Sequence, residues 1–454
     1  TARSNHRMST PTNTQQLAEP EENEAQLHDL VRLVAVAAVA GALTGVVGGL
    51  FRTLLEDMHE ALTTVMSYWH DLDAAGALVP GWMWALLLGG ACMGLSRWMV
   101  RLAPLAGGSG IQHVEGVFHD VAKPAPLRVL PIKFIGGLLA MAPGSALGRE
   151  GPTVQMAAVI GNVCGEVARL CRADRFLLYT AVAGSGLAVA FNTPLAGLAF
   201  VNEEVSRSVT LRRTLVTLTA VATAMLSFWS IYGNTLEFQV SSPEIPSFAA
   251  LGAMTVLGAL CGVMGAGYNQ TVLGALNRFD SFTVLSPEIK ATLIGMLIGL
   301  ATWFYPTGMG GGENQAQQIL SGQFGFVTLL ILFGFRWIMG PVSYAAGTPG
   351  GLFSPMLLLG AALGSLFAMA LSATGLCEVS ATNFALIGMA ALFAGVVRAP
   401  LTGILLVIEM TGSTVLMVPL LTASGAAVLV ASLLHNEPIY DSLLARMVAA
   451  RKPV

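Results

Sequence analysis

Long stretches without a charged side chain restrict the fold of this 454-residue chain more than any other feature of its sequence. Windows of at least 19 residues without Asp, Glu, Lys or Arg include 33–51, 74–96, 176–202, 214–236, 245–277, 291–312 and 337–377. A helix needs about 20 apolar residues to cross a bilayer. The chain is 54% hydrophobic and 11% charged, whereas a soluble domain has roughly 25% charged residues. We therefore predict an all-α integral membrane protein.

Several of these windows are longer than one crossing, which predicts hairpins or broken helices. Clusters of basic residues flank the windows, and the positive-inside rule places such clusters in the cytoplasm. The window 176–202 must then leave the cytoplasm and return, yet it is too short for two full crossings of about 20 residues each. We expect two half-length helices that break near Asn192-Thr-Pro194. The basic clusters are Arg97/Arg101, Arg169/Arg172/Arg175, Arg207/Arg212/Arg213 and Arg446/Arg451/Lys452.

The two halves of the sequence repeat one another. Matched residues lie 203 or 206 positions apart: Gly107/Gly310, Lys133/Arg336, Gly137/Gly340, Gly144/Gly347, Gly148/Gly351, Pro152/Pro355, Pro194/Pro400 and Glu203/Glu409. Such repeats are common in secondary transporters, whose substrate sites lie where the repeats meet. We predict two inverted-topology membrane repeats, at 29–240 and 247–440. A cytoplasmic tail with a short surface helix (1–28) precedes them, and a cytoplasmic tail (441–454) follows.

The sequence also argues against several functional classes. A net charge of −3 indicates no nucleic-acid partner. The five cysteines form no CxxC pair and the seven histidines no HExxH or other metal-ligand spacing, so we expect no metal site, no disulfide framework and no cofactor. No GxSxG, P-loop or Rossmann motif is present, so we do not expect an enzyme.

Four short segments place glycine at the predicted start of a helix. The first N–H groups of a helix are unpaired and carry a partial positive charge, so they form a site for an anion. Partial charges and hydroxyl groups bind an anion weakly enough to release it. The pattern predicts an anion transporter. The segments are 107–112, 148–152, 310–315 and 350–355.

In this order and spacing, the segments resemble those of the CLC family of chloride channels and transporters. Gly108–Ile111 is similar to the family's GSGIP segment, Gly148–Pro152 to its GREGP segment and Gly351–Pro355 to its GxFxP segment. The resemblance covers roughly residues 30–450 and includes 191–197, 399–403 and 438–440. It implies the CLC fold of mostly tilted and broken helices, and a homodimer with one pathway per subunit.

The resemblance implies a chloride site built from hydroxyl and backbone N–H donors. Residues at the positions of Ser109 and Tyr440 donate hydroxyl hydrogen bonds to a central dehydrated anion in the family. The N–H groups of Leu352 and Phe353 complete that site, and Arg149, Glu150 and Gly151 are also expected to bind anions. The residues alone leave open that Ser109 is a packing or capping residue and that Tyr440 is an interfacial aromatic residue.

Two glutamates are expected to carry protons. Glu150 follows Gly-rich backbone at a helix start, where an ionised carboxylate can occupy an anion site; protonation frees that site. The resemblance implies that Glu150 is gate and proton acceptor, and that Glu204 relays protons to and from the cytoplasm. Glu203 matches Glu409 in the repeat, which indicates a structural role, whereas Glu204 matches Met410. A structural cap at Glu150 and a solvated charge at Glu204 are the alternatives.

Lys133 and Arg336 are cations in apolar segments. The resemblance implies that Lys133 helps to set the potential near the gate. Charge pairing with buried carboxylates such as Glu115 or Glu313 is the alternative.

Together, the motifs and the resemblance predict a chloride/proton antiporter, with a passive chloride channel on the same scaffold as the alternative. Its partners are chloride, protons and the lipid bilayer. Gln112 and His113 depart from the family pattern just past Ser109, which bears on the finer anion preference, and we expect His113 in a loop. Few residues follow Tyr440, so we expect no regulatory CBS domains. The expected location is a prokaryotic plasma membrane, with both termini in the cytoplasm.

Overall fold

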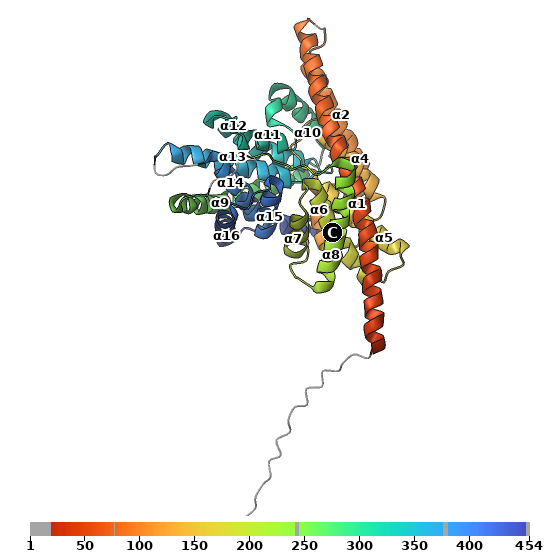
Figure 1. Ribbon diagram of the computed structural model, residues 1–454. Coiled ribbons are helices and arrows are strands. Elements are labelled where there is room, and N and C mark those ends of the chain that lie inside the picture. Colours follow the sequence, from red (N-terminus) through yellow and green to blue (C-terminus); the bar gives the residue numbers. More distant parts are fainter. Residues whose placement is uncertain (1–19, 77, 241–244, 376–379, 451–454) are drawn as a thin grey trace, which may run out of the picture.

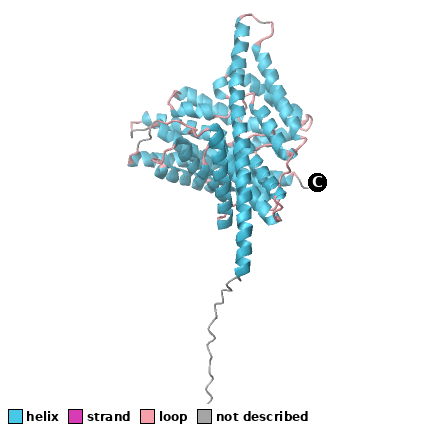
Figure 2. Cartoon of the chain, turned by 45° about the vertical axis from the view of Figure 1, so that its right-hand side comes forward, coloured by secondary structure: helices cyan, strands magenta, loops and turns pink. Residues whose placement is uncertain are grey.

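The structure is a computed structural model that describes residues 20–76, 78–240, 245–375 and 380–450. Every regular element in those ranges is a helix, which confirms the predicted all-α class (Figures 1 and 2). The helices are α1 (Pro20–Ala74), α2 (Gly81–Val100), α3 (Ile111–Phe118), α4 (Val129–Met141), α5 (Glu150–Val167), α6 (Arg172–Phe191), α7 (Pro194–Phe200), α8 (Leu211–Tyr232), α9 (Phe248–Ser281), α10 (Pro287–Phe304), α11 (Glu313–Leu320), α12 (Phe326–Ala345), α13 (Phe353–Ser372), α14 (Ala381–Val397), α15 (Pro400–Thr411), α16 (Met417–Leu433) and α17 (Ile439–Ala449).

Six of the described helices are long and apolar enough to cross a membrane: α1, α2, α8, α9, α12 and α13. Large apolar side chains are exposed on peripheral helices, among them Val256 and Val263 on α9 and Leu293 and Leu297 on α10. Such a surface is favourable against lipid and unfavourable in water. The chain is therefore an integral membrane protein.

Helix α1 runs along one side of the molecule (Figure 1). The short surface helix expected before residue 29 is not separate, because it is the beginning of this 55-residue helix. The helix also continues past the uncharged window 33–51 to Ala74. Residues 1–19 of the predicted tail lie outside the described residues.

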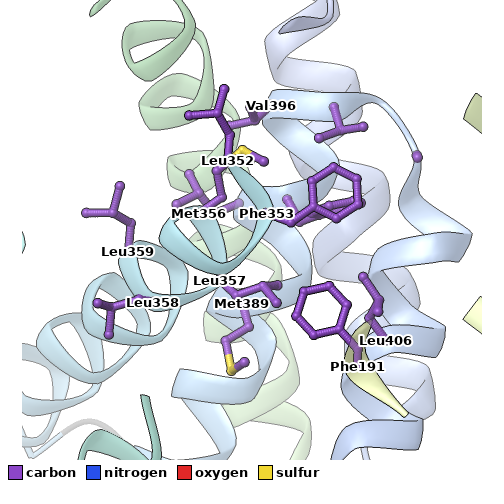
Figure 3. Packing of buried hydrophobic residues seen from close by; sticks show 14 of the residues in the cluster. Phe191, Leu352, Phe353, Met356, Leu357, Leu358, Leu359, Met389, Val396 and Leu406 are labelled. Carbon is purple, nitrogen blue, oxygen red and sulfur yellow. The ribbon is translucent and has the colours of Figure 1, made fainter. Parts of the chain in front are cut away.

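Two helix pairs form the buried centre: α5 with α6 in the first half, and α13 with α14 in the second. Glycines allow close packing of the second pair, since a methyl group on Gly360 would collide with the carbonyl oxygen of Gly388. Figure 3 shows the beginning of α13, where Leu352, Phe353 and Met356 pack against Val396 and the surrounding apolar side chains. This apolar centre holds the start of α13 in place.

The two halves contact each other through reciprocal hydrogen bonds. Gly148 N–H donates to Gly351 O at 3.0 Å, and Gly351 N–H donates to Gly148 O at 2.7 Å. Glu203 accepts from backbone N–H groups at the start of α15 at 2.7 and 3.0 Å. Glu409, its repeat counterpart, accepts from those at the start of α7 at 2.8 and 2.9 Å. The exchange of equivalent partners indicates an approximate two-fold relation between the halves.

The window 176–202 breaks where the sequence predicted. Asn192 ends α6 in the left-handed region at φ 56°, and Pro194 begins α7. The first of the two expected half-length helices is longer than predicted, because α6 begins at Arg172 and has 20 residues, whereas α7 has seven. A π-helical turn, Val201–Val205, follows α7 and carries both glutamates of the pair. Such turns inside helical segments are frequent at functional sites.

Candidate functional site

The starts of three helices meet at the centre of the molecule. The loop before α3 pairs with the loop before α13 through a bridge between Gly108 and Pro349, and the starts of α5 and α13 are paired through Gly148 and Gly351. Ser109, before α3, lies against Gly151 of α5, because a methyl group on Gly151 would collide with its side chain. The first N–H groups of three helices, which have no partner within their own helix, thus lie in one region.

Glu150 places its carboxylate at the start of α13. Oε1 accepts from Phe353 N–H at 2.6 Å and from Ser354 N–H at 3.3 Å, and Oε2 accepts from the Ser354 hydroxyl at 3.2 Å. The residue is fully buried. A Cβ on Gly351 would lie 2.5 Å from Oε1, so glycine leaves the space that the carboxylate fills. The carboxylate therefore occupies an anion site of the kind expected at a helix N-terminus.

Ser109 and Tyr440 bring two hydroxyl groups together. Both residues are fully buried, and their hydroxyls lie near enough to interact. Neither hydroxyl makes a hydrogen bond of normal geometry within the described part of the chain. The Phe353 ring lies 5.7 Å from the Tyr440 ring and 4.7 Å from that of Phe393, centroid to centroid. Buried hydroxyl donors beside apolar rings are suited to a dehydrated anion.

The other predicted anion-binding residues differ in their surroundings. Leu352 is buried at the start of α13, and the N–H of Phe353 donates to Glu150. The Arg149 guanidinium donates to Ala190 O at 3.0 Å and to Glu237 Oε1 at 2.5 Å. The Arg149 side chain lines a cavity whose lining includes neither Ser109 nor Tyr440.

Arg149 lines a cavity of about 440 Å³, which we call the Arg149 cavity. Ion pairs connect Arg149 with Glu56 at 3.3 Å and Arg52 with Glu237 at 2.9 Å. The charged or titratable side chains that line the cavity are Arg52, Glu56, His59, Glu60, Arg149, Glu237 and Glu313. The cavity gives Arg149 and Glu313 a route to solvent beside the buried Glu150.

Glu204 lies on the π-helical turn and is 1% exposed. Its Oε1 has no hydrogen-bond partner within the described ranges. The charged groups that act on it are Glu115, Arg207, Asp441 and Glu203. Arg207 forms ion pairs with Glu115, at 3.0 Å, and with Asp441. A buried carboxylate next to a charged cluster at the molecular surface can exchange protons with that surface.

Lys133 and Arg336 bind loop carbonyl groups. Lys133 Nζ donates to Ala106 O at 3.1 Å and to Gly108 O at 2.6 Å. Arg336 donates to Gly308 O, Gly310 O and Gly311 O at 3.3, 2.6 and 3.0 Å. The alternative of direct pairing with Glu115 or Glu313 is wrong, because neither cation forms an ion pair in the described structure. Each cation instead fixes the Gly-rich loop of its own half.

The two residues that depart from the family pattern make different contacts. Gln112 Oε1 accepts from Gly110 N–H at 3.2 Å. His113 does not lie in a loop, as expected from the sequence, but in α3, where Nδ1 lies 3.1 Å from the Tyr179 hydroxyl. In the described ranges, no three His, Cys, Asp or Glu residues are arranged to hold a metal ion.

Two residues at the gate were not predicted as site residues: Ser354 was not considered, and Glu313 was considered only as a charge partner for a buried cation. Ser354 stands at the variable position of the 351–355 segment, and its hydroxyl contacts Glu150. Glu313 stands at the start of α11, where the same hydroxyl contacts it at 3.0 Å. Both residues lay inside segments already singled out by their glycines. The available signal was a polar side chain at a predicted helix start.

A family model and known proteins match most of this chain. The family model described as "Voltage gated chloride channel" matches residues 89–432. The H(+)/Cl(-) exchange transporter ClcA of Vibrio campbellii is 37% identical over 428 residues, which are 90% of this chain and 88% of the relative. The ClcA of Salmonella arizonae is 35% identical over 442 residues, 92% of this chain and 89% of the relative.

Solved structures share the fold. A slow cyanobacterial Cl-/H+ antiporter superimposes with a TM-score of 0.87 at 33% identity, covering 92% of this chain and 99% of that chain. A eukaryotic CLC transporter superimposes with a TM-score of 0.77 at 21% identity, covering 92% of this chain and 74% of that one. The second likeness bears on the fold alone.

Proposed function

We propose that this chain, which belongs to the voltage-gated chloride channel (CLC) family, exchanges chloride for protons across a membrane. Relatives at 35–37% identity are named H(+)/Cl(-) exchange transporters. The structural neighbour at 33% identity is a Cl-/H+ antiporter. These names favour an exchanger over the passive channel.

The carboxylate of Glu150 at the start of α13 is the observation that carries the proposal. Its Oε1 takes the Phe353 N–H at 2.6 Å, a donor that an anion entering this site also needs. Ionised Glu150 and chloride therefore compete for one site. Once protonated, Glu150 has no charge to attract the helix N-terminus, so chloride can displace it. One titratable group then couples the movement of the two ions.

Chloride in the central site would be held by the hydroxyls of Ser109 and Tyr440 and by the N–H groups of Leu352 and Phe353. Both hydroxyls are buried without a hydrogen bond of normal geometry in the described part of the chain. This set of donors contains no ammonium or guanidinium group, so chloride would be bound weakly enough to be released.

Protons would reach Glu150 from the cytoplasmic side of the membrane, through Glu204. Its burial on the π-helical turn, beside the cluster of Glu115, Arg207 and Asp441, suits a relay between the interior and the surface. A passive channel has no use for such a relay. Glu204→Gln should abolish proton movement while chloride continues to move, and a parallel loss of both would favour a structural role for Glu204.

The oligomeric state and membrane location that we propose are those that the family resemblance implies. We expect a homodimer with one pathway per subunit, in a prokaryotic plasma membrane with both termini in the cytoplasm. The basic clusters at the ends of apolar helices support that orientation. With this orientation, the Arg149 cavity opens to the outside. The bound species are chloride and protons; we expect no cofactor and no enzymatic reaction.

Protein reconstituted into liposomes tests the function. A chloride gradient is imposed, the voltage is clamped with a potassium ionophore, and external pH is recorded. Exchange predicts proton movement against the proton gradient. Chloride flux without proton movement would favour the passive channel, and no chloride flux would refute anion transport.

A further inference from the structure

The Ser354 hydroxyl lies between two carboxylates. Its Oγ is 3.2 Å from Oε2 of Glu150 and 3.0 Å from Oε1 of Glu313. A serine hydroxyl has one proton to donate and two lone pairs that accept. It can serve both carboxylates only when one of them is protonated and donates to Oγ. The three groups are therefore arranged as a chain along which one proton can move.

Glu313 differs from Glu150 in its access to solvent. Glu150 is fully buried, whereas the Glu313 side chain is 27% exposed and lines the Arg149 cavity. A Cβ on Gly311 would lie 2.5 Å from Glu313 Oε2, so this glycine leaves room for the carboxylate. Glu313 is thus in contact with the solvent-accessible cavity and, through one hydroxyl, with the gate.

Glu313 is closer to the Ser354 hydroxyl than to the cation beside it. Its Oε1 lies 4.0 Å from Arg149 Nε, at the outer limit of an ion pair. Arg149 is already paired with Glu237 at 2.5 Å and with Glu56 at 3.3 Å. The shortest polar side-chain contact of Glu313 is the 3.0 Å bond from Ser354. Positive charge from Arg149 still favours the ionised form, which is the form that accepts a proton.

Other charged groups share this environment. Arg52, Arg149 and Arg336 act on Glu313 electrostatically, as does Glu150. The remaining titratable side chains of the cavity are Glu56, His59, Glu60 and Glu237. None of these four makes a hydrogen bond to Ser354 in the described structure.

We propose that Glu313, acting through the Ser354 hydroxyl, passes protons between Glu150 and the Arg149 cavity. The inference rests on the proposed chloride/proton exchange and names the route by which the proton leaves or enters on the cavity side. In the outward step, the O–H bond of protonated Glu150 breaks and its proton bonds to Ser354 Oγ. The Ser354 O–H bond breaks at the same time, and that proton bonds to the Glu313 carboxylate. Glu150 becomes a carboxylate, Ser354 remains a hydroxyl, and Glu313 releases the proton to water.

The test compares proton-coupled transport with chloride flux that needs no proton. Ser354→Ala removes the bridge and keeps both carboxylates; Glu313→Gln removes the acceptor. Glu60→Gln, in the same cavity without a contact to Ser354, is the control. We expect each of the first two variants to slow coupled exchange in liposomes by about tenfold. A positioned acid–base group accelerates proton transfer by roughly 10²-fold or more. Water in the cavity takes over part of this transfer, so the expected loss is smaller. The control should match the parent protein.

A second comparison separates a relay from a structural role. In a Glu150→Gln background, no carboxyl group at the gate binds or releases a proton, so we expect chloride to cross without one and the relay to have nothing to carry. Adding Ser354→Ala or Glu313→Gln to that background should leave chloride flux within about twofold, because no acid–base step remains to be lost.

Three results would overturn the inference: coupled exchange unchanged in Ser354→Ala, coupled exchange unchanged in Glu313→Gln, or an equal loss of flux in the Glu150→Gln background. Failure of the proposed function is distinct, because the unmodified protein would then move chloride without protons.

Discussion

Substitution of Gly148 by alanine would displace the Glu150 gate while leaving its carboxyl group intact. A Cβ at position 148 would have the Glu150 carboxyl group as its nearest neighbour, with Cδ at 2.6 Å. Ordinary contact between carbon atoms is about 3.5–4.0 Å, so the carboxyl group has to move by about 1 Å. That movement lengthens its bonds from Phe353 N–H and from the Ser354 hydroxyl, now 2.6 and 3.2 Å.

The cost follows from the two bonds. A hydrogen bond to a charged group contributes about 1.5–3 kcal/mol, and a shift of this size loses roughly half of each, or about 2 kcal/mol in total. The equilibrium constant for occupation of the α13 site by ionised Glu150 should fall by about 30-fold. Chloride, which competes with the carboxylate, should bind more tightly, and fewer protons should move per chloride.

Isothermal titration of chloride at a pH where Glu150 is ionised measures the first effect, and the liposome assay measures the second. Gly274→Ala in α9 is a matched control, since a Cβ there meets nothing within 4 Å. If Gly148→Ala binds chloride with the affinity of the control and keeps the same coupling ratio, ionised Glu150 and chloride do not compete for the α13 site.

Three further substitutions probe the surroundings of the site. Tyr440→Phe removes one hydroxyl donor and should weaken chloride binding by about tenfold; unchanged affinity by titration would remove Tyr440 from the anion site. Glu203→Gln should lower stability by about 2 kcal/mol, because charge-assisted bonds to the start of α15 become neutral ones; thermal unfolding checks this, and an unaltered melting temperature would contradict it. Lys133→Met leaves the carbonyls of Ala106 and Gly108 without their donor, so chloride binding should weaken by about tenfold or more; parental affinity would show that the loop holds without the cation.

The sequence predicted the features that depend on the order of residues along the chain. Uncharged windows predicted the membrane class. Repeated Gly and Pro positions matched residues such as Gly148 and Gly351, and the structure shows that the backbones of these two hydrogen-bond to each other. The break at Asn192 was also predictable, because Pro194 cannot continue the preceding helix. These signals are local, or repeat at a fixed offset.

Features that depend on three-dimensional contact could not be read in this way. Lys133 looked like a candidate for an ion pair, but its partners are backbone carbonyls, which have no sequence signature. The hydroxyl of Ser354 meets Glu313 across 41 positions of chain, and no spacing rule predicts that contact. The continuation of α1 beyond the apolar window was hidden, because Arg52, Glu56 and later charges interrupt the hydrophobic pattern.

The reversal potential tests the central claim of coupled exchange most directly. Currents through the reconstituted protein are recorded at a fixed chloride gradient while only the pH gradient is changed. Exchange predicts that the voltage at which the current reverses moves with the pH gradient, and that this dependence disappears in Glu204→Gln. A reversal potential fixed by chloride alone at every pH gradient would contradict the account and identify a passive channel.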